Sequence, residues 1–173
     1  WRIRCKHPDT GDKWTRPMHW NGSAFVIGEP AAPAEGKPLY RLPELLAADP
    51  ADVVLIVEGE WCADHLHKLG LIVTTSGSAA SASGTDWAPL GGGSCLLWPD
   101  HDAPGSKYAE EVAAILRALD CTVEVIDVAP LGLPDKGDAV DWLAMHADAT
   151  AADVLALPRL AASVVGDQSA PSI

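Results

Sequence analysis

The chain has 173 residues, of which 48% are hydrophobic, and a formal net charge of −12. This length and composition are typical of a globular domain with its own core, and the lack of any run of 18 apolar residues excludes a membrane-spanning helix. The chain begins with Trp1 and has no charged-then-apolar leader, so we expect it to be a segment of a longer protein. Its four cysteines form no CxxC pair, which favours a reducing, cytoplasmic compartment.

The charge is unevenly distributed along the chain. Residues 1–22 carry a net charge of +3, whereas the other 151 residues carry −15. The acidic residues 23–173 would repel a phosphate backbone. If nucleic acid is the partner, it would have to contact bound metal ions, the basic segment or further domains. Trp14 and Trp20 in this segment could stack on the bases of a single-stranded template or pack against a sheet. The basic residues that we expect to contact DNA are Arg2, Arg4, Lys13 and Arg16.

The first forty residues predict a small β-rich unit. Residues 1–5 and 14–20 alternate in the manner of strands, and a turn signal separates them. We therefore divide the chain into a β-rich basic segment with its linker (1–37), a larger domain (38–162) and a flexible tail (163–173).

From residue 42 onward, helical and strand patterns alternate. Such alternation, with continuous apolar runs as strands, predicts an α/β domain whose mostly parallel four-stranded sheet is flanked by helices. The predicted strands are 53–57, 71–74, 95–98 and 123–128, and the predicted helices are 42–48, 60–69, 106–119, 139–145 and 151–157.

Acidic residues follow three of the four predicted strands. Glu58 closes the first, Asp100 and Asp102 follow the third, and Asp138 and Asp141 follow the fourth. Because the carboxyl ends of parallel strands meet at one edge of a sheet, we expect these clusters to converge. Carboxylates brought so close repel one another unless a cation neutralises them, and oxygen ligands suit Mg²⁺ or Mn²⁺.

Neighbouring residues could assist such a site. Gly59 and Gly105 would let the backbone turn sharply beside the first two clusters. Lys107 and Lys136 follow the second cluster and precede the third, where they could either reach a nucleotide phosphate or face solvent. His101 could likewise contact phosphate or face solvent.

Three stretches of the chain together resemble the Toprim domain, a Rossmann-like catalytic fold shared by bacterial primases and topoisomerases. They read VVLIVEGE, LLWPDHDAPGSKYAEE and KGDAVDWL, and the resemblance covers about residues 38–147. The variant that they resemble most is the phage- and plasmid-type DNA primase, which is often fused to a replicative helicase.

The resemblance implies a role for each acidic cluster. Glu58 would serve as acid/base or metal ligand, Asp100 and Asp102 as the metal-binding pair, and Asp138 as a further ligand. The three catalytic residues would be Glu58, Asp100 and Asp102. The implied reaction is primer synthesis on single-stranded DNA, in which a 3′-hydroxyl attacks the α-phosphate of an NTP with the help of two Mg²⁺ (or Mn²⁺) ions.

The chain also departs from the pattern of those primases. Cys62 stands where they often carry an acidic residue, and the chain has no zinc-binding module for scanning a template. Two alternatives therefore stay open. One is a Toprim nuclease, which would use the same carboxylates to activate water, and the other is a degenerate Toprim domain that only docks template or partner domains.

Overall fold

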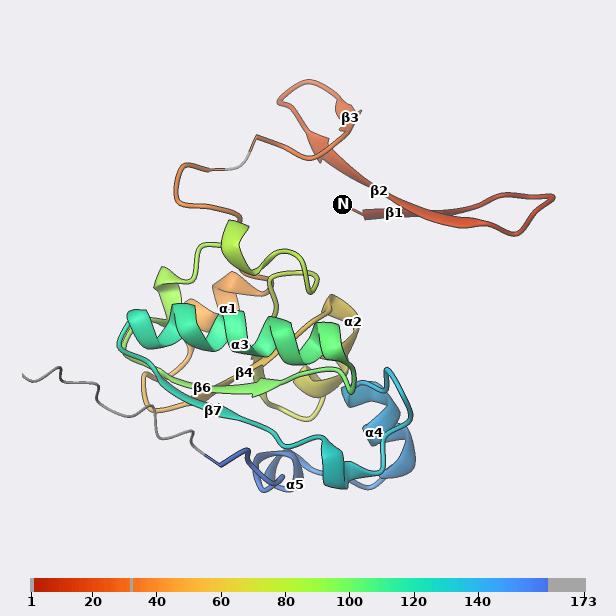
Figure 1. Cartoon of the computed structure of the whole chain (residues 1–173). Helices are drawn as coiled ribbons and strands as arrows, with labels where there is room; N and C mark the ends of the chain where they lie inside the picture. Colours follow the sequence, from red (N-terminus) through yellow and green to blue (C-terminus); the bar gives the residue numbers. More distant parts are fainter. Residues whose placement is uncertain (1, 32, 162–173) are drawn as a thin grey trace, which may run out of the picture. The chain divides into compact units, whose positions relative to one another are not determined.

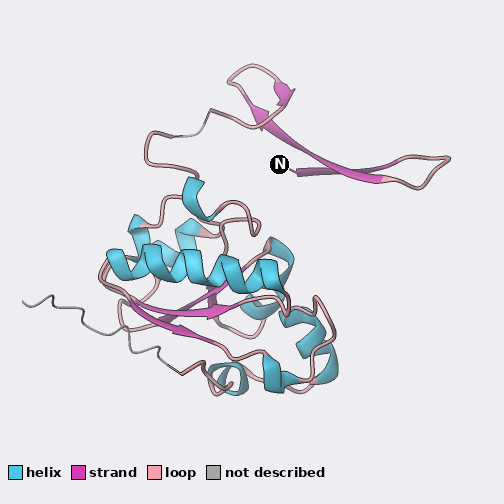
Figure 2. Cartoon of the chain, in the orientation of Figure 1, coloured by secondary structure: helices cyan, strands magenta, loops and turns pink. Residues whose placement is uncertain are grey.

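The computed structural model of the chain describes residues 2–31 and 33–161 and divides the chain into two compact units, 1–37 and 38–173 (Figure 1). The predicted tail, 163–173, lies outside the described residues. The second unit confirms the predicted α/β fold, with helices on both sides of a parallel sheet (Figure 2). No helix in the described part of the chain is long and apolar enough to cross a membrane.

The first unit is a three-stranded antiparallel sheet in the order β1-β2-β3. Its strands are β1 (Arg2–Lys6), β2 (Lys13–Trp20) and β3 (Phe25–Ile27). His7 shapes the turn after β1, because its Nδ1 accepts hydrogen bonds from the N–H groups of Asp9 and Thr10, each at 3.2 Å. None of the side chains described between residues 2 and 37 is buried, so those described form no core.

The sheet of the second unit is parallel throughout and has the order β5-β4-β6-β7. Its strands are β4 (Val53–Val57), β5 (Ile72–Thr74), β6 (Ser94–Trp98) and β7 (Thr122–Val125). β4 and β6 are in register, with Val57 opposite Trp98. These two strands are the central ones of the sheet and most of their residues are buried, which explains their largely apolar sequences.

Helices cover both faces of this sheet. They are α1 (Leu42–Ala47), α2 (Glu60–His67), α3 (Ala103–Ala118), α4 (Ala139–Met145) and α5 (Ala151–Leu155), with short 3₁₀ turns η1 (Ala82–Gly84), η2 (Ala88–Leu90) and η3 (Ala129–Leu131). On one face, α1 and α3 pack against Ile56 and Leu97; on the other, α2, α4 and α5 pack against Leu55 and Leu96 (Figure 1). Successive residues of these strands thus pack into the cores on opposite faces of the sheet.

Several element boundaries differ from the prediction by one or two residues, and two differ by three. α3 begins at Ala103 rather than 106, because Asp102 caps the helix and its Oδ1 accepts a hydrogen bond of 2.7 Å from the N–H of Gly105. β7 ends at Val125 rather than 128. The N–H of Ile126 still donates to Leu97 O of β6 (2.9 Å), but Ile126 pairs with Arg159 in an antiparallel bridge.

The strand order creates a topological switch point between β4 and β6. From β4 the chain runs through α2 to β5 on one side, then returns past β4 to β6 on the other side. In open α/β sheets, the carboxyl ends of the strands at such a reversal border a crevice in which ligands bind. Glu58 and Asp100 follow β4 and β6 at this point.

Candidate functional site: an acidic edge of the sheet

The first turn of α3 lies directly against Glu58 and Asp100. A Cβ atom added to the buried Gly105 would stand 2.7 Å from Glu58 Oε1 and 2.5 Å from the carbonyl oxygen of Asp100. Such distances are shorter than any side chain tolerates, so only glycine allows the helix, the loop after β6 and the Glu58 carboxylate to approach this closely. Gly105 therefore provides space rather than the sharp turn predicted from the sequence.

Gly59 also differs from its predicted role. Its φ of −133° and ψ of 152° are extended backbone that any residue adopts, and a Cβ atom added to it would meet nothing within 4 Å. The chain therefore passes from β4 into α2 without a glycine-specific turn.

Glu58 has a carboxylate oxygen without a partner. Its Oε1 is buried and accepts no hydrogen bond. Burial raises the pKa of Glu58 above its ordinary value, the nearby Asp102 carboxylate raises it further, and the backbone of Asp100 acts in the opposite direction. A buried oxygen that carries negative charge and lacks a donor is costly, and a cation would relieve that cost.

Asp100 is the centre of the acidic edge. Burial, followed by repulsion from Glu58, Asp138, Asp102 and Asp141, raises the pKa of Asp100 from 3.8 to about 7. The fold thus gathers the carboxylates of all three sequence clusters around Asp100, as the topology of a parallel sheet requires.

Asp102 and Asp138 already serve as helix caps. Asp102 caps α3 through Gly105, and Asp138 caps α4, where its Oδ1 accepts hydrogen bonds from Val140 N (2.7 Å) and Asp141 N (3.0 Å). The Asp141 carboxylate accepts in return from the N–H of Asp138, which completes a capping box. These hydrogen bonds hold both carboxylates toward their own helices.

A tryptophan pair fixes α4 relative to β6. Trp98 and Trp142 pack edge to face with ring centroids 5.6 Å apart. Trp142 lies one turn after Asp138, so this contact sets the position of the third acidic cluster beside the end of β6.

His101 joins the loop after β6 to the loop that precedes α4. Its Nδ1 lies 3.1 Å from Leu133 O and 3.0 Å from Pro134 O. Carbonyl oxygens only accept, so Nδ1 carries the hydrogen and donates it. The backbone reinforces the link, since His101 N donates to Gly137 O (2.8 Å) and Lys136 N donates to His101 O (3.1 Å). No motif in the sequence predicts this connection.

Cys62 is buried on α2 beside Asp138. Burial raises the pKa of its thiol, and the charge of Asp138 and a hydrogen bond to that carboxylate raise it further. The thiol is therefore neutral and donates to Asp138. Position 62 therefore holds a neutral thiol instead of the acidic residue that the resemblance led us to expect.

The predicted basic residues do not gather at this edge in one group. Lys107, on α3, and Lys136, which has a φ of 60°, are both exposed. The other four belong to the first unit; they are Arg2, Arg4, Lys13 and Arg16.

The acidic edge suits a hard cation in chemistry but is not a preformed metal site. Carboxylate oxygens are the donors that Mg²⁺ and Mn²⁺ prefer, and the buried Glu58 Oε1 has no hydrogen-bond partner that an ion would have to displace. However, within residues 2–31 and 33–161 no three His, Cys, Asp or Glu side chains are arranged to hold a metal. The caps at Asp102 and Asp138 explain this, and one of these carboxylates would have to turn to complete a site with Glu58 and Asp100.

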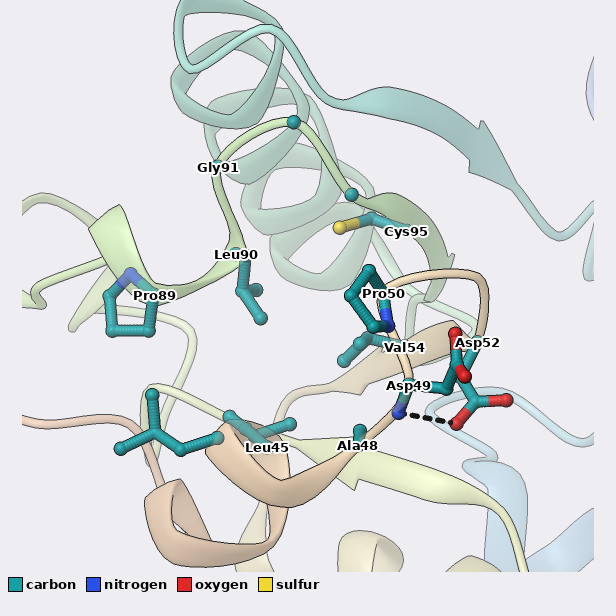
Figure 3. A pocket seen from close by; sticks show the side chains of 13 residues that line it. Leu45, Ala48, Asp49, Pro50, Asp52, Val54, Pro89, Leu90, Gly91 and Cys95 are labelled. Atoms are coloured by element: carbon teal, nitrogen blue, oxygen red, sulfur yellow. Dashed lines mark hydrogen bonds between the residues drawn. The ribbon is translucent and has the colours of Figure 1, made fainter.

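A pocket of about 320 Å³ lies at the opposite edge of the sheet (Figure 3). It is lined by the chain around Pro50 and by the glycine-rich turn 91–93, near the amino ends of β4 and β6. All three glycine N–H groups donate to carbonyl oxygens, those of Ala88, Leu119 and Leu90. The N–H groups of this turn are therefore not available to bind an anion. The pocket lies at the other edge of the sheet from the carboxylates of Glu58 and Asp100.

Comparisons with models of protein families, with curated proteins and with solved structures found no match to this chain. Its function therefore has to be argued from the acidic edge and from the motifs that form it.

Proposed function

We propose that the chain is the catalytic domain of a DNA primase, which synthesises short RNA primers on single-stranded DNA in a metal-dependent reaction. The observation that carries the proposal is the gathering of carboxylates around Asp100 at the switch point, next to the orphaned Glu58 Oε1. The motif sequences and their order along the chain resemble those of Toprim primases. This resemblance favours primer synthesis over other phosphoryl-transfer reactions.

The residues at the acidic edge have distinct proposed roles in binding metal ions and phosphates. Glu58 and Asp100 hold the cations, with Asp102 or Asp138 as the ligand that turns from its helix cap. Bound Mg²⁺ or Mn²⁺, in two ions, supplies charge that stabilises the attacking and leaving oxygens of the transferred phosphoryl group. Lys107 and Lys136 are exposed near these clusters and contact the phosphates of the incoming NTP.

Two contacts hold the acidic edge in place. They are the His101 clamp, by which we mean the hydrogen bonds from His101 Nδ1 to Leu133 O and Pro134 O, and the Trp98–Trp142 pair. Both tie the Asp138 helix to the end of β6, so the carboxylates from two elements stay together although they repel one another. The elements that carry the carboxylates are thus fixed before the substrate arrives, and only one cap side chain has to turn to complete the site.

One alternative is supported by a specific observation. The acid expected at position 62 is a neutral cysteine, and no three-ligand cluster stands ready among the described residues. Both findings favour a degenerate Toprim domain that docks a template or a partner and performs no chemistry. A nuclease that activates water with the same carboxylates is distinguished from a primase only by its products.

The proposed partners follow from the proposed reaction. They are single-stranded DNA, NTPs and a fused or associated replicative helicase, in the cytoplasm. Residues outside the first segment carry a net charge of −15, so contact with DNA would depend on the cations and on the basic segment.

The test is primer synthesis by the chain on single-stranded DNA with labelled NTPs and Mg²⁺ or Mn²⁺. The variant Asp100→Asn removes the central charge while keeping the shape of the side chain. Glu110→Gln removes one exposed charge on α3 and is the matched control. Products a few nucleotides long, absent with Asp100→Asn and present with Glu110→Gln, are the result we expect.

The other outcomes identify the alternatives. Shortened template in place of new product would assign the chain to the nucleases. Neither product, with template still bound and the isolated chain fully folded, would favour the docking domain. Synthesis that survives Asp100→Asn would contradict the role given to the acidic edge.

A further inference from the structure

The strand register of the first unit separates its residues into two sets. Directly paired residues of antiparallel strands share a face, and alternate residues along each strand lie on the same side. One set contains Ile3, Cys5, Trp14, Arg16, Met18, Trp20, Phe25 and Ile27. Most of the basic residues, namely Arg2, Arg4, Lys6 and Lys13, occupy register positions of the other set.

The first set forms an exposed aromatic face, defined here by Trp14, Arg16, Trp20 and Phe25. Trp14 is 45% exposed, Trp20 49% and Phe25 54%. Large aromatic side chains this exposed, on a sheet whose described side chains form no core, do not stabilise the fold by burial. Clusters of exposed aromatic side chains mark interaction surfaces.

Neighbouring side chains orient both tryptophans. The Arg16 guanidinium lies over the Trp14 ring, with its central carbon 5.4 Å from the ring centroid. Trp20 packs edge to face with Phe25 at 5.1 Å between centroids. Two aromatic platforms, one with a cation beside it, are thus held on the same side of β2.

We propose that this aromatic face binds single-stranded nucleic acid, with bases stacked on Trp14 and Trp20, with Arg16 on the same face beside Trp14, and with the net positive charge of the segment attracting the phosphates. The proposal rests on the primase function above, for which it supplies the template-binding surface. Trp14 and Trp20 are six residues apart on one strand, a span of roughly 20 Å, so they stack on separate bases. Stacking on aromatic platforms along a positively charged path is the general mode of single-strand binding.

Charge complementarity selects this occupant. The segment 1–22 has a net charge of +3 in a chain whose other residues carry −15, so a polyanion is attracted here and repelled elsewhere. A duplex is disfavoured, because its base faces are stacked on one another and are not available to the tryptophans.

The test is the affinity of the chain for a fluorescently labelled oligothymidylate, measured by anisotropy in EDTA. Trp14→Ala and Trp20→Ala should each weaken binding roughly tenfold, the loss typical of one base–aromatic stack. Trp20→Phe should retain most of the affinity, since phenylalanine also stacks. Trp61→Ala is the control, because Trp61 is 66% exposed but lies on α2 of the second unit.

Several results would overturn the proposal. They are unchanged affinity in both tryptophan-to-alanine variants, an equal loss in Trp61→Ala, equally tight binding of duplex DNA, or a change of oligomeric state in these variants without a change in affinity. Because EDTA removes the cations, binding should persist in Asp100→Asn. The test therefore stands even if the chain synthesises no primers.

Discussion

Gly105 and Gly59 flank the same carboxylate, yet only Gly105 is required by its surroundings. A Cβ atom at Gly105 would press on Glu58 Oε1 and on the Asp100 backbone, whereas one at Gly59 would meet nothing. Gly105→Ala should therefore lower the free energy of unfolding by about 1–3 kcal/mol, the usual cost of overpacking. Gly59→Ala should cost less than about 1 kcal/mol. Urea denaturation measures both, and equal costs would refute the close approach that we describe.

The shifted pKa of Asp100 makes stability depend on pH in an unusual direction. With a pKa of about 7 in the folded chain, against an ordinary 3.8, Asp100 keeps a proton when folded that the unfolded chain has released. The free energy of unfolding should therefore fall as the pH rises from about 4 to about 7 and stay low above it. Asp100→Asn should flatten this decline and be more stable than the parent above about pH 7.

Denaturation curves across this pH range provide the measurement, with Glu110→Gln as the control for loss of one surface charge. Glu58 shifts in the same direction, so a smaller decline should remain in the Asp100 variant. A decline as steep in Asp100→Asn as in the parent would show that Asp100 is not the carboxyl held protonated.

At the scale of elements, the His101 clamp is what joins the end of β6 to the loop before α4. His101→Ala removes the Nδ1–H that donates to Leu133 O and Pro134 O, which should cost about 1–2 kcal/mol. It should also speed hydrogen exchange at Lys136 and Gly137. His101→Asn restores a donor and should recover part of both losses.

The control for this clamp is His65→Ala. His65 Nδ1 lies 2.8 Å from the Trp61 carbonyl within its own helix, so its loss should leave exchange at Lys136 and Gly137 unchanged. If His101→Ala also left those amides as protected as in the parent, the backbone hydrogen bonds alone would hold the loop.

The sequence predicted the elements of the second unit well because their signals are local. The apolar run of β4 and the strand bounds 53–57 agree with the structure, as do the bounds of α4, 139–145. The predicted start of α3 is three residues too late, since the cap by Asp102 depends on the position of a side chain. The end of β7 was misplaced because Ile126 pairs with a distant residue, Arg159.

At the scale of the whole molecule, topology explains why the acidic clusters could be predicted to converge. Parallel strands bring their carboxyl ends to one edge whatever the separation in sequence, and acidic residues of all three clusters raise the pKa of Asp100. The cap roles of Asp102 and Asp138, the orphaned oxygen of Glu58 and the His101 clamp depend on three-dimensional contacts. No sequence pattern predicts the last two, whereas an aspartate directly before a helix is a recognised cap signal.

The two units divide the requirements of the proposed function. The second unit has a core on each face of its sheet and a strongly acidic edge, whereas the first has an aromatic face and basic residues but no buried side chain among those described. An acidic site for cations and a separate basic surface for template would let one acidic chain handle a polyanion.

The central claim is that Glu58 and Asp100 hold a divalent cation, and its most direct test is Mn²⁺ binding followed by electron paramagnetic resonance of the free ion. The parent chain and Glu110→Gln should bind Mn²⁺ alike, and Asp100→Asn should bind it at least roughly tenfold more weakly. Equal Mn²⁺ affinity in the parent and in Asp100→Asn, or no binding by the folded parent, would contradict the account.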